Sequence, residues 1–163
     1  MSVLNAARGI ILAICLLSGT SIGLAGERFT DNGDGTITDH QERLMWAKYD
    51  NQGDINWHEA SLYCRTGPNQ VLGKYHNWRM PTIKELETLF LSSDSEPSYE
   101  ADCGQRLKVV PHIKLSCGWI WSGEVRSITA RVYNFHRGYS YTDRKVHKRH
   151  YRALPVRTLD PDE

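Results

Sequence analysis

The residues of this chain best suited to recognition chemistry lie in one basic stretch near its C-terminal end. From Arg126 to Arg152 the sequence holds eight arginines and lysines, four tyrosines and a single acid, Asp143. Arginine offers a planar fork of donors to sulfate, phosphate or carboxylate groups. Tyrosine offers rigid, amphipathic contact area. This mixture of side chains is typical of a surface that binds an anionic ligand.

Within this stretch we predict a ligand-binding loop that follows a turn at residues 136–138. Its expected contacts are the cations and tyrosines Arg137, Tyr139, Tyr141, Arg144, Lys145, Lys148 and Arg149. The alternative is a solvated loop whose charge balances an acidic half of the chain. Residues 27–102 hold 14 acidic and 7 basic side chains, whereas residues 103–163 hold 5 and 12. This asymmetry of sign favours a side that faces a partner.

Catalytic and metal-binding patterns are weaker. His147 and His150 would share a face of a helix, but an extended segment places them on opposite faces. Ser122 has no evident base to activate it as a nucleophile. We therefore predict no catalytic residue, no metal site and no cofactor.

One N-terminal motif has some features of a calcium loop. Asn32-Gly33 and Asp34-Gly35 are strong turn dipeptides, and alternating residues flank them, so a β-hairpin is expected. If Gly35 is the sixth position of an EF-hand loop, Thr30 is first and Gln41 twelfth, where carboxylates are required. We favour the hairpin and keep calcium as the less favoured alternative.

The first residues have the pattern of a secretory signal peptide. Arg8 precedes an apolar run from residue 9 to 17, and small residues then lead to Ala25. We predict that residues 1–25 are removed and that residues 26–163 form one domain in the periplasm or outside the cell. An uncleaved anchor helix is less favoured, because residues 18–21 interrupt the run. No later run is long enough for stable membrane insertion, and export makes an envelope or extracellular glycan more accessible than nucleic acid.

The cysteines are consistent with an oxidising compartment. Cys15 leaves with the leader, so three cysteines remain and at most one intramolecular bridge can form. We predict a disulfide between Cys103 and Cys117, which bracket a short loop. Closing about 15 residues contributes on the order of 3 kcal/mol. Cys64 lies on a predicted helix and is expected to be a small buried hydrophobe.

The elements that position the basic stretch are predicted to be two helices and several short strands. Pro81 precedes Thr82 and Glu85, which form a capping box for a helix that is apolar on one face as far as Phe90. A second helix is expected from an Asn56 cap to about Arg65. Strands are expected at residues 44–46, 117–123, 129–135 and 151–157, with Pro155 at an edge or a bulge. Residues 92–102 are expected to form a solvated loop.

The order of these signatures resembles that of a known family, the Lcl C-terminal domain family of exported bacterial domains. The resemblance rests on Phe29-Thr30-Asp31-Asn32-Gly33-Asp34-Gly35-Thr36-Ile37-Thr38-Asp39, Leu44-Met45-Trp46, Trp57-His58-Glu59-Ala60, Trp78-Arg79-Met80-Pro81-Thr82 with Glu85-Leu86, Trp121-Ser122, Asn134-Phe135 with Gly138, and residues 152–157. It implies an α+β, C-type-lectin-like fold with two helices, a small mixed or antiparallel sheet closed by the chain ends, and long ligand loops. Some members resemble adhesins that bind polyanionic glycans.

Two departures limit what the resemblance implies. Many members carry a cysteine in the last strand, where this chain has Ala153, Leu154 and Pro155, so a bridge from Cys64 to that strand is excluded. The formylglycine-generating enzymes, which share the broad fold, need a reactive cysteine pair late in the chain, and no cysteine follows Cys117. We therefore expect an exported, adhesin-like module for an anionic glycan or other polyanion. The alternatives are an exported enzyme of unassigned reaction and a structural subunit of an envelope assembly.

Overall fold

The computed structural model describes residues 27–66, 74–93 and 97–162, which form an α+β arrangement as predicted. Its helices and strands, in chain order, are β1 (Phe29–Asp31), β2 (Thr36–Asp39), β3 (Leu44–Ala47), α1 (Trp57–Thr66), α2 (Ile83–Glu87), β4 (Tyr99–Glu100), β5 (Arg106–Leu107), β6 (Trp119–Arg126), β7 (Thr129–Asn134), β8 (Tyr139–Arg144), β9 (Tyr151–Arg152) and β10 (Val156–Thr158). The predicted signal peptide and its cleavage point lie outside the described residues.

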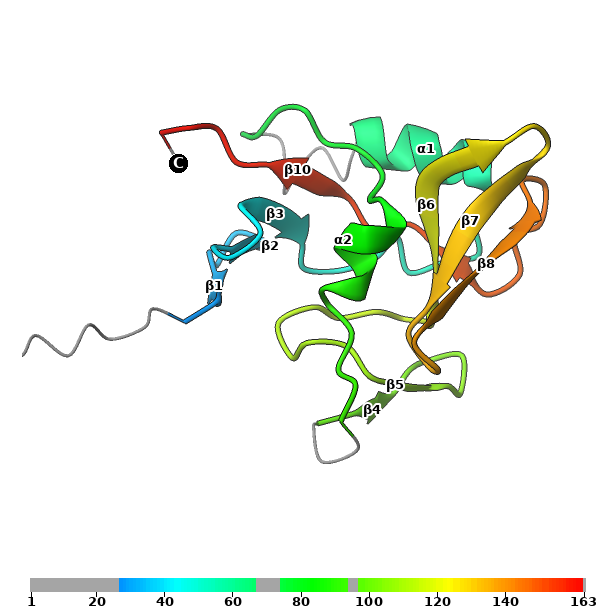
Figure 1. Cartoon of the computed structure of the whole chain (residues 1–163), viewed down its shortest axis with the longest axis horizontal. Helices are drawn as coiled ribbons and strands as arrows, with labels where there is room; N and C mark the ends of the chain where they lie inside the picture. Colours follow the sequence, from blue (N-terminus) through cyan, green and yellow to red (C-terminus); the bar gives the residue numbers. More distant parts are fainter. Residues whose placement is uncertain (1–26, 67–73, 94–96, 163) are drawn as a thin grey trace, which may run out of the picture.

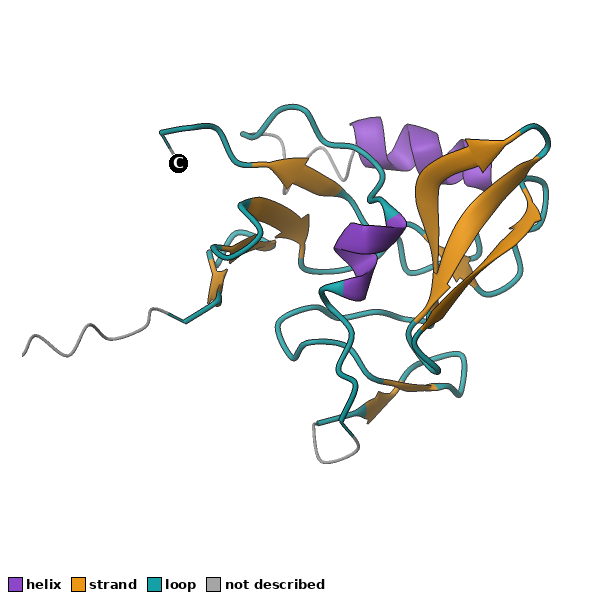
Figure 2. Ribbon diagram, in the orientation of Figure 1, coloured by secondary structure: helices purple, strands orange, loops and turns teal. Residues whose placement is uncertain are grey.

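The strands form two four-stranded sheets and one small ribbon. The first sheet has the order β1-β2-β3-β10, so the last strand pairs with a strand from the start of the chain. The second has the order β8-β7-β6-β9, antiparallel except for the parallel pair of β6 and β9. In Figure 1 and Figure 2, α2 lies between the two sheets, and the β4–β5 ribbon lies below them. Helix α1 contacts β6, and α2 contacts β7.

The predicted N-terminal hairpin is confirmed, and its carboxylates serve the turn. Oδ1 of Asp31 accepts a hydrogen bond from the N–H of Gly33 at 3.0 Å, and Oδ1 of Asp34 accepts one from the N–H of Thr36 at 3.1 Å. Gly33 adopts a φ of 74°, a conformation that glycine reaches without steric cost. The Lys48 ammonium group lies 2.6 Å from Oδ2 of Asp31. The segment is thus arranged as a hairpin turn and not as an EF-hand loop.

Helix α2 begins with the predicted capping box. Oγ1 of Thr82 accepts a hydrogen bond from the N–H of Glu85, and Oε2 of Glu85 accepts one from the N–H of Thr82. Arg79 donates to both carboxylate oxygens of Glu85, at 2.8 and 2.6 Å. Burial alone would raise the pKa of Glu85, but the hydrogen bonds from Arg79 and Thr82 outweigh it and lower the pKa. The box therefore holds an ionised carboxylate at the helix start.

The helix is shorter than predicted, because it ends at Glu87 and not near Phe90. The next residues leave the helix to pair with a distant segment: Phe90 forms a bridge with Val109, and the N–H of Val110 donates to the C=O of Leu89. Leu86 and Leu89 are fully buried in the core between the sheets, as the apolar pattern predicted. Tertiary pairing thus overrides the last turn of the helical pattern.

Thr82→Ala is expected to lower the free energy of unfolding by about 1 kcal/mol, because it removes the acceptor for a first-turn N–H. Chemical denaturation of purified protein measures this change. Thr82→Ser keeps the hydroxyl acceptor and should retain most of the stability. An unchanged midpoint and slope for Thr82→Ala would show that the hydroxyl does not support the helix.

The cysteine predictions are also confirmed. Cys103 and Cys117 form a disulfide with their Cα atoms 5.5 Å apart, which ties the segment after β4 to the start of β6. Cys64 is free and fully buried on α1, and burial raises the pKa of its thiol. Asn56 caps this helix, since Oδ1 of its side chain accepts from the N–H groups of His58 and Glu59.

Two sequence-based expectations are wrong in part. Residues 92–102 include β4, whose Tyr99 is half-buried and binds the backbone of Leu115 through its hydroxyl group. Residues 151–157 form two strands in different sheets, β9 and β10, and not one. Pro155 lies between these strands and lacks an N–H, so it sits where the chain crosses from one sheet to the other.

Candidate functional site

The predicted ligand loop is largely a β-strand. Residues Tyr139–Arg144 form β8, the edge strand of the second sheet, and pair with β7 along their whole length. Tyrosine and threonine favour extended backbone, and the segment alternates between more and less exposed side chains. The sequence-based loop is therefore wrong for these residues, and only the residues between β8 and β9 form a loop.

This strand separates the seven predicted ligand residues into two groups. Arg137 and Tyr139 lie at the β7–β8 turn, whereas Arg144 and Lys145 lie at the other end of β8. At about 3.4 Å per residue, the two ends of the strand are about 17 Å apart. Tyr139 and Tyr141 also lie on one face of the sheet and Arg144 on the other, because side chains alternate along a strand. The predicted residues thus do not form a single site.

Tyr141 is partly buried and packs against the core. Its hydroxyl donates to the hydroxyl of Tyr151 at 3.1 Å, and Tyr151 donates in turn to Asp143. Burial raises the pKa of Tyr141. Tyr139 differs, since 47% of its surface remains exposed. Tyr139 is therefore the more accessible of the two predicted tyrosines, and Tyr141 is partly buried.

The loop after β8 contacts α1 through Lys145, and its histidines make local contacts. Lys145 places its ammonium group 4.7 Å from the centre of the Trp57 ring, and Nε of Arg149 donates to Nε2 of His150. Nδ1 of His147 lies 2.8 Å from Oδ1 of Asp143, whereas the ring of His150 contacts Arg149. Lys148 is exposed. The loop is thus a basic surface with defined local contacts.

One group of three potential metal ligands occurs among the described residues. Cys103, Cys117 and His150 bring their ligand atoms within 4.8 Å of one another. The two sulfur atoms are joined in the disulfide, so neither is available as a thiolate. In this oxidised form the group does not provide a metal centre.

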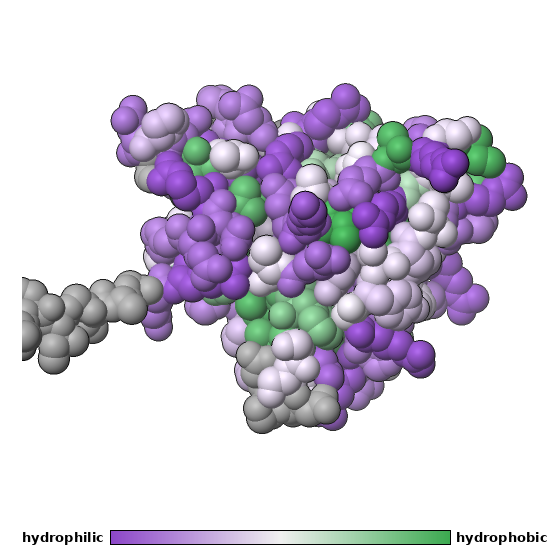
Figure 3. Space-filling model, in the orientation of Figure 1, coloured by the Kyte–Doolittle hydropathy of each residue, from purple (hydrophilic) through white to green (hydrophobic). Residues whose placement is uncertain are grey.

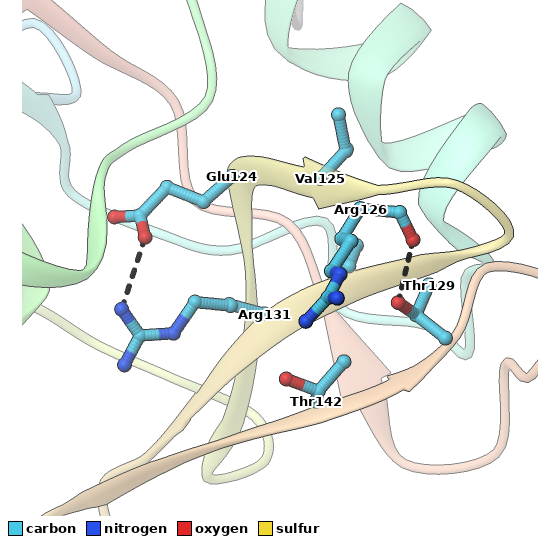
Figure 4. Close-up of a pocket in the computed structure, with 7 residues that line it drawn as sticks. Glu124, Val125, Arg126, Thr129, Arg131 and Thr142 are labelled. Carbon is cyan, nitrogen blue, oxygen red and sulfur yellow. Dashed lines mark hydrogen bonds and ion pairs between the residues drawn. The ribbon is translucent and has the colours of Figure 1, made fainter.

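A groove of about 600 Å³ lies on the face of the second sheet that carries Arg144, at the β6–β7 hairpin. It is lined by residues from three adjacent strands: Glu124, Val125, Arg126, Thr129, Ala130, Arg131 and Thr142. Figure 4 shows the side chain of Arg126 extending into this groove, and Glu124 and Arg131 paired at its other end. We call this depression the β6–β8 groove.

The strand register explains how the groove residues come together. Arg126 pairs with Thr129, and Thr129 pairs with Arg144 on its other side. Directly paired residues lie on the same face of a sheet, so the two arginines flank one threonine, with their backbones about 10 Å apart. Arg131 and Thr142 form the next pair along the same face.

An irregularity in β6 anchors one end of the groove to helix α2. The register of β6 shifts between Trp121 and Val125. Within this shift, Oε1 of Glu124 accepts a hydrogen bond from the N–H of Ile83 at 2.7 Å, and Oε2 accepts one from Arg131 at 3.0 Å. A bulge redirects side chains in this way. Glu124 therefore neutralises Arg131 and joins the sheet to the first turn of α2.

The other two arginines keep their charge available. No hydrogen bond or ion pair joins the guanidinium groups of Arg126 and Arg144 to any residue in the described part of the chain. Both side chains are exposed, and so is Thr142, which lies two residues from Arg144 on the same face of β8. Arg126 lines the groove, and Arg144 lies beside it on the same face of the sheet. Two uncompensated guanidinium groups in this arrangement can bind two acidic groups of one ligand.

Sequence reasoning included Arg144 and counted Arg126 as basic, but it did not connect the two. The neighbourhood of Arg126 and Thr129 could have been predicted, because a tight turn at Ser127 and Ile128 places them opposite each other. The position of Arg144 could not, because Arg144 lies beside Thr129 only when residues 139–144 form a strand that pairs with β7.

These features define an α+β fold whose last two strands join two sheets and whose second sheet carries a cationic groove. The chain belongs to the Lcl C-terminal domain family, whose model matches residues 35–157, and this confirms the resemblance seen in the sequence. No significant match was found among curated proteins or among solved structures. None of the helices in the described segments is long and apolar enough to cross a membrane.

Proposed function

We propose that this chain is an exported binding module that recognises an anionic glycan or other polyanion through the β6–β8 groove. The observation that carries the proposal is the pair of unneutralised guanidinium groups of Arg126 and Arg144 on one face of the sheet. Lys145 and Lys148 extend the positive surface beyond Arg144. The proposed ligand class is the one expected from the sequence. The proposed site retains Arg144, Lys145 and Lys148 from the predicted residues and adds Arg126.

The fold and the compartment are part of the same proposal. A C-type-lectin-like architecture is supported by two helices and by the pairing of β10 with β3, which brings the two ends of the domain into one sheet. Export is supported by the leader pattern of residues 1–25 and by the Cys103–Cys117 disulfide, since disulfides persist in oxidising compartments.

The chemistry of the groove favours a polymer over a single small anion. Its arginines stand about 10 Å apart across three strands, which suits successive acidic groups of one chain. Exposed charges are screened over about 8 Å at physiological ionic strength, so binding should weaken as salt rises. Hydroxyl groups such as that of Thr142 offer neutral hydrogen bonds to a sugar backbone.

The test is a titration with heparin, a sulfated polyanion, at low and at physiological salt. Arg126→Gln with Arg144→Gln should weaken binding about tenfold or more, because each arginine–sulfate contact contributes roughly 1 kcal/mol and a factor of ten needs about 1.4 kcal/mol. The matched control is Arg137→Gln, which removes an exposed arginine at the far end of β8.

The proposal predicts that the control retains nearly full affinity. A loss in the control of about half the double variant's change in binding free energy would show that net charge, and not the groove, governs binding, because the control removes one positive charge and the double variant removes two. Absence of heparin binding by the wild-type protein at low salt would overturn the proposal. The length of the heparin recovered from the mixture separates the module from an exported enzyme, since only an enzyme shortens the chain.

A further inference from the structure

The end of the second sheet beside the groove exposes apolar side chains to water. Ile128, in the β6–β7 turn, is 64% exposed, and Val146, in the loop after β8, is 67% exposed. The N–H of Lys145 donates to the C=O of Ile128 at 3.0 Å, so these two segments lie side by side. Val125 adds a third side chain, 50% exposed. We call Val125, Ile128 and Val146 the apolar tip.

Figure 3 shows hydrophobic atoms at the upper right, where Figure 1 places the β6–β7 turn, in separate spots with hydrophilic atoms between and around them. Isolated exposed apolar residues are ordinary on protein surfaces. Six large apolar side chains are exposed in the described part of the chain. Three of them, the residues of the apolar tip, occur in the β6–β7 hairpin and in the loop after β8, which lie side by side.

Cations surround the apolar tip. Arg126 and Arg144 pair with the same residue of β7, directly beside the turn, and Lys145 and Lys148 belong to the loop that carries Val146. The nearby acids are already engaged, since Glu124 pairs with Arg131 and Asp143 with His147. The tip is therefore an apolar centre with an uncompensated positive border.

A soluble polyanion would satisfy the border and leave the apolar centre in water. A second copy of this chain would cover the centre but would bring two positive borders together. The surface of an anionic lipid bilayer matches both parts, because apolar side chains enter the boundary of the acyl chains while cations meet the phosphate groups. This complementarity of charge and polarity selects the occupant.

We propose that the apolar tip docks this domain on the surface of an anionic lipid bilayer. Ile128 and Val146 enter the headgroup boundary, and Arg126, Arg144, Lys145 and Lys148 contact lipid phosphates. The contact is peripheral and involves loop side chains alone, so it needs no membrane-spanning segment. The inference goes beyond the proposed function, since Ile128 and Val146, on which it rests, do not line the groove, although Val125 does.

The test is sedimentation of the exported protein with vesicles of phosphatidylcholine, alone or mixed with phosphatidylglycerol. The wild-type protein should bind the mixed vesicles and release them as salt rises. Ile128→Ser with Val146→Ser should weaken this binding tenfold or more and leave heparin affinity unchanged. The control Tyr139→Ser removes an exposed aromatic residue at the opposite end of β8 and should bind as the wild type does.

Several results would overturn the inference: no binding of wild-type protein to mixed vesicles, equal binding to both compositions, or full binding by the serine double variant. Loss of self-association as the only effect of that variant, measured by sedimentation velocity, would assign the tip to a second copy and also overturn it. Heparin titration of the same proteins keeps the two proposals separate. Vesicle binding without heparin binding removes only the groove proposal, and heparin binding without vesicle binding removes only this one.

Discussion

Replacing Arg152 with methionine is expected to lower the free energy of unfolding by about 1.5–3 kcal/mol, because it removes charge-assisted hydrogen bonds made by a buried guanidinium group. Arg152 is only 6% exposed, although it belongs to the basic stretch of the sequence. Its Nε donates to the hydroxyl of Ser116 at 2.7 Å, and its Nη1 donates to Asp54 at 2.8 Å. Ser116 donates in turn to the buried carboxylate of Asp50. Methionine fills a similar volume but satisfies none of these groups.

The deficit of this variant should shrink at acid pH. Burial raises the pKa of Asp50, against the hydrogen bonds of Ser116 and the charge of Arg152. The hydrogen bond from Arg152 is the largest cause that lowers the pKa of Asp54. Both carboxylates lose their attraction to Arg152 when they are protonated. The stabilisation by Arg152 is therefore present at neutral pH and is lost as the pH falls, first through the pKa of Asp50 and then through that of Asp54.

Denaturation of wild type and variants across pH measures both effects. Arg152→Lys keeps the charge but not the fork of donors, so its loss should be intermediate. Arg137→Met is the control for removing an exposed arginine and should change stability little. A pH-independent loss in Arg152→Met would mean that packing, and not charge, accounts for the effect.

Gly138→Ala is expected to lower the free energy of unfolding by about 2–5 kcal/mol for two independent reasons. Gly138 adopts a φ of 73° in the β7–β8 turn, where an L-residue with a Cβ is strained by roughly 1–2 kcal/mol. A Cβ there would also lie 2.4 Å from two ring carbons of Phe90. Forcing extra volume into a packed region typically costs about 1–3 kcal/mol. The ring is partly buried and lies edge-on to Tyr133, so moving it away gives up this contact.

Gly33 provides the matched control for this prediction. It has nearly the same conformation, with a φ of 74°, but a Cβ there would have no neighbour within 4 Å. Gly33→Ala therefore measures the conformational cost alone, and Gly138→Ala should exceed it by the cost of the contact with Phe90. Phe90→Leu in the Gly138→Ala background should recover part of the difference. Equal losses of unfolding free energy in the two alanine variants would show that the contact with Phe90 does not contribute.

The sequence by itself predicted the features that depend on neighbouring residues. The hairpin before residue 39 follows from turn dipeptides whose own carboxylates accept the backbone N–H groups of the turn. The capping box of Thr82 and Glu85 is complete within four residues. The Cys103–Cys117 disulfide closes a short loop, and the family resemblance follows from the order of such local signatures. These interactions have the same partners in almost any compact fold of this chain.

Only the tertiary structure decided which polar residues are exposed and which lie side by side. Residues 139–144 have the composition of a basic loop, but they pair with β7 and form a strand. This pairing places Arg137 and Arg144 at opposite ends of the strand and brings the hydroxyl of Tyr141 to that of Tyr151. Arg152 and Arg144 are the same residue type in the same stretch. Arg152 is buried and donates hydrogen bonds to Ser116 and Asp54, whereas Arg144 is exposed. Burial and register depend on partners that are distant in the chain, so composition and spacing alone do not determine them.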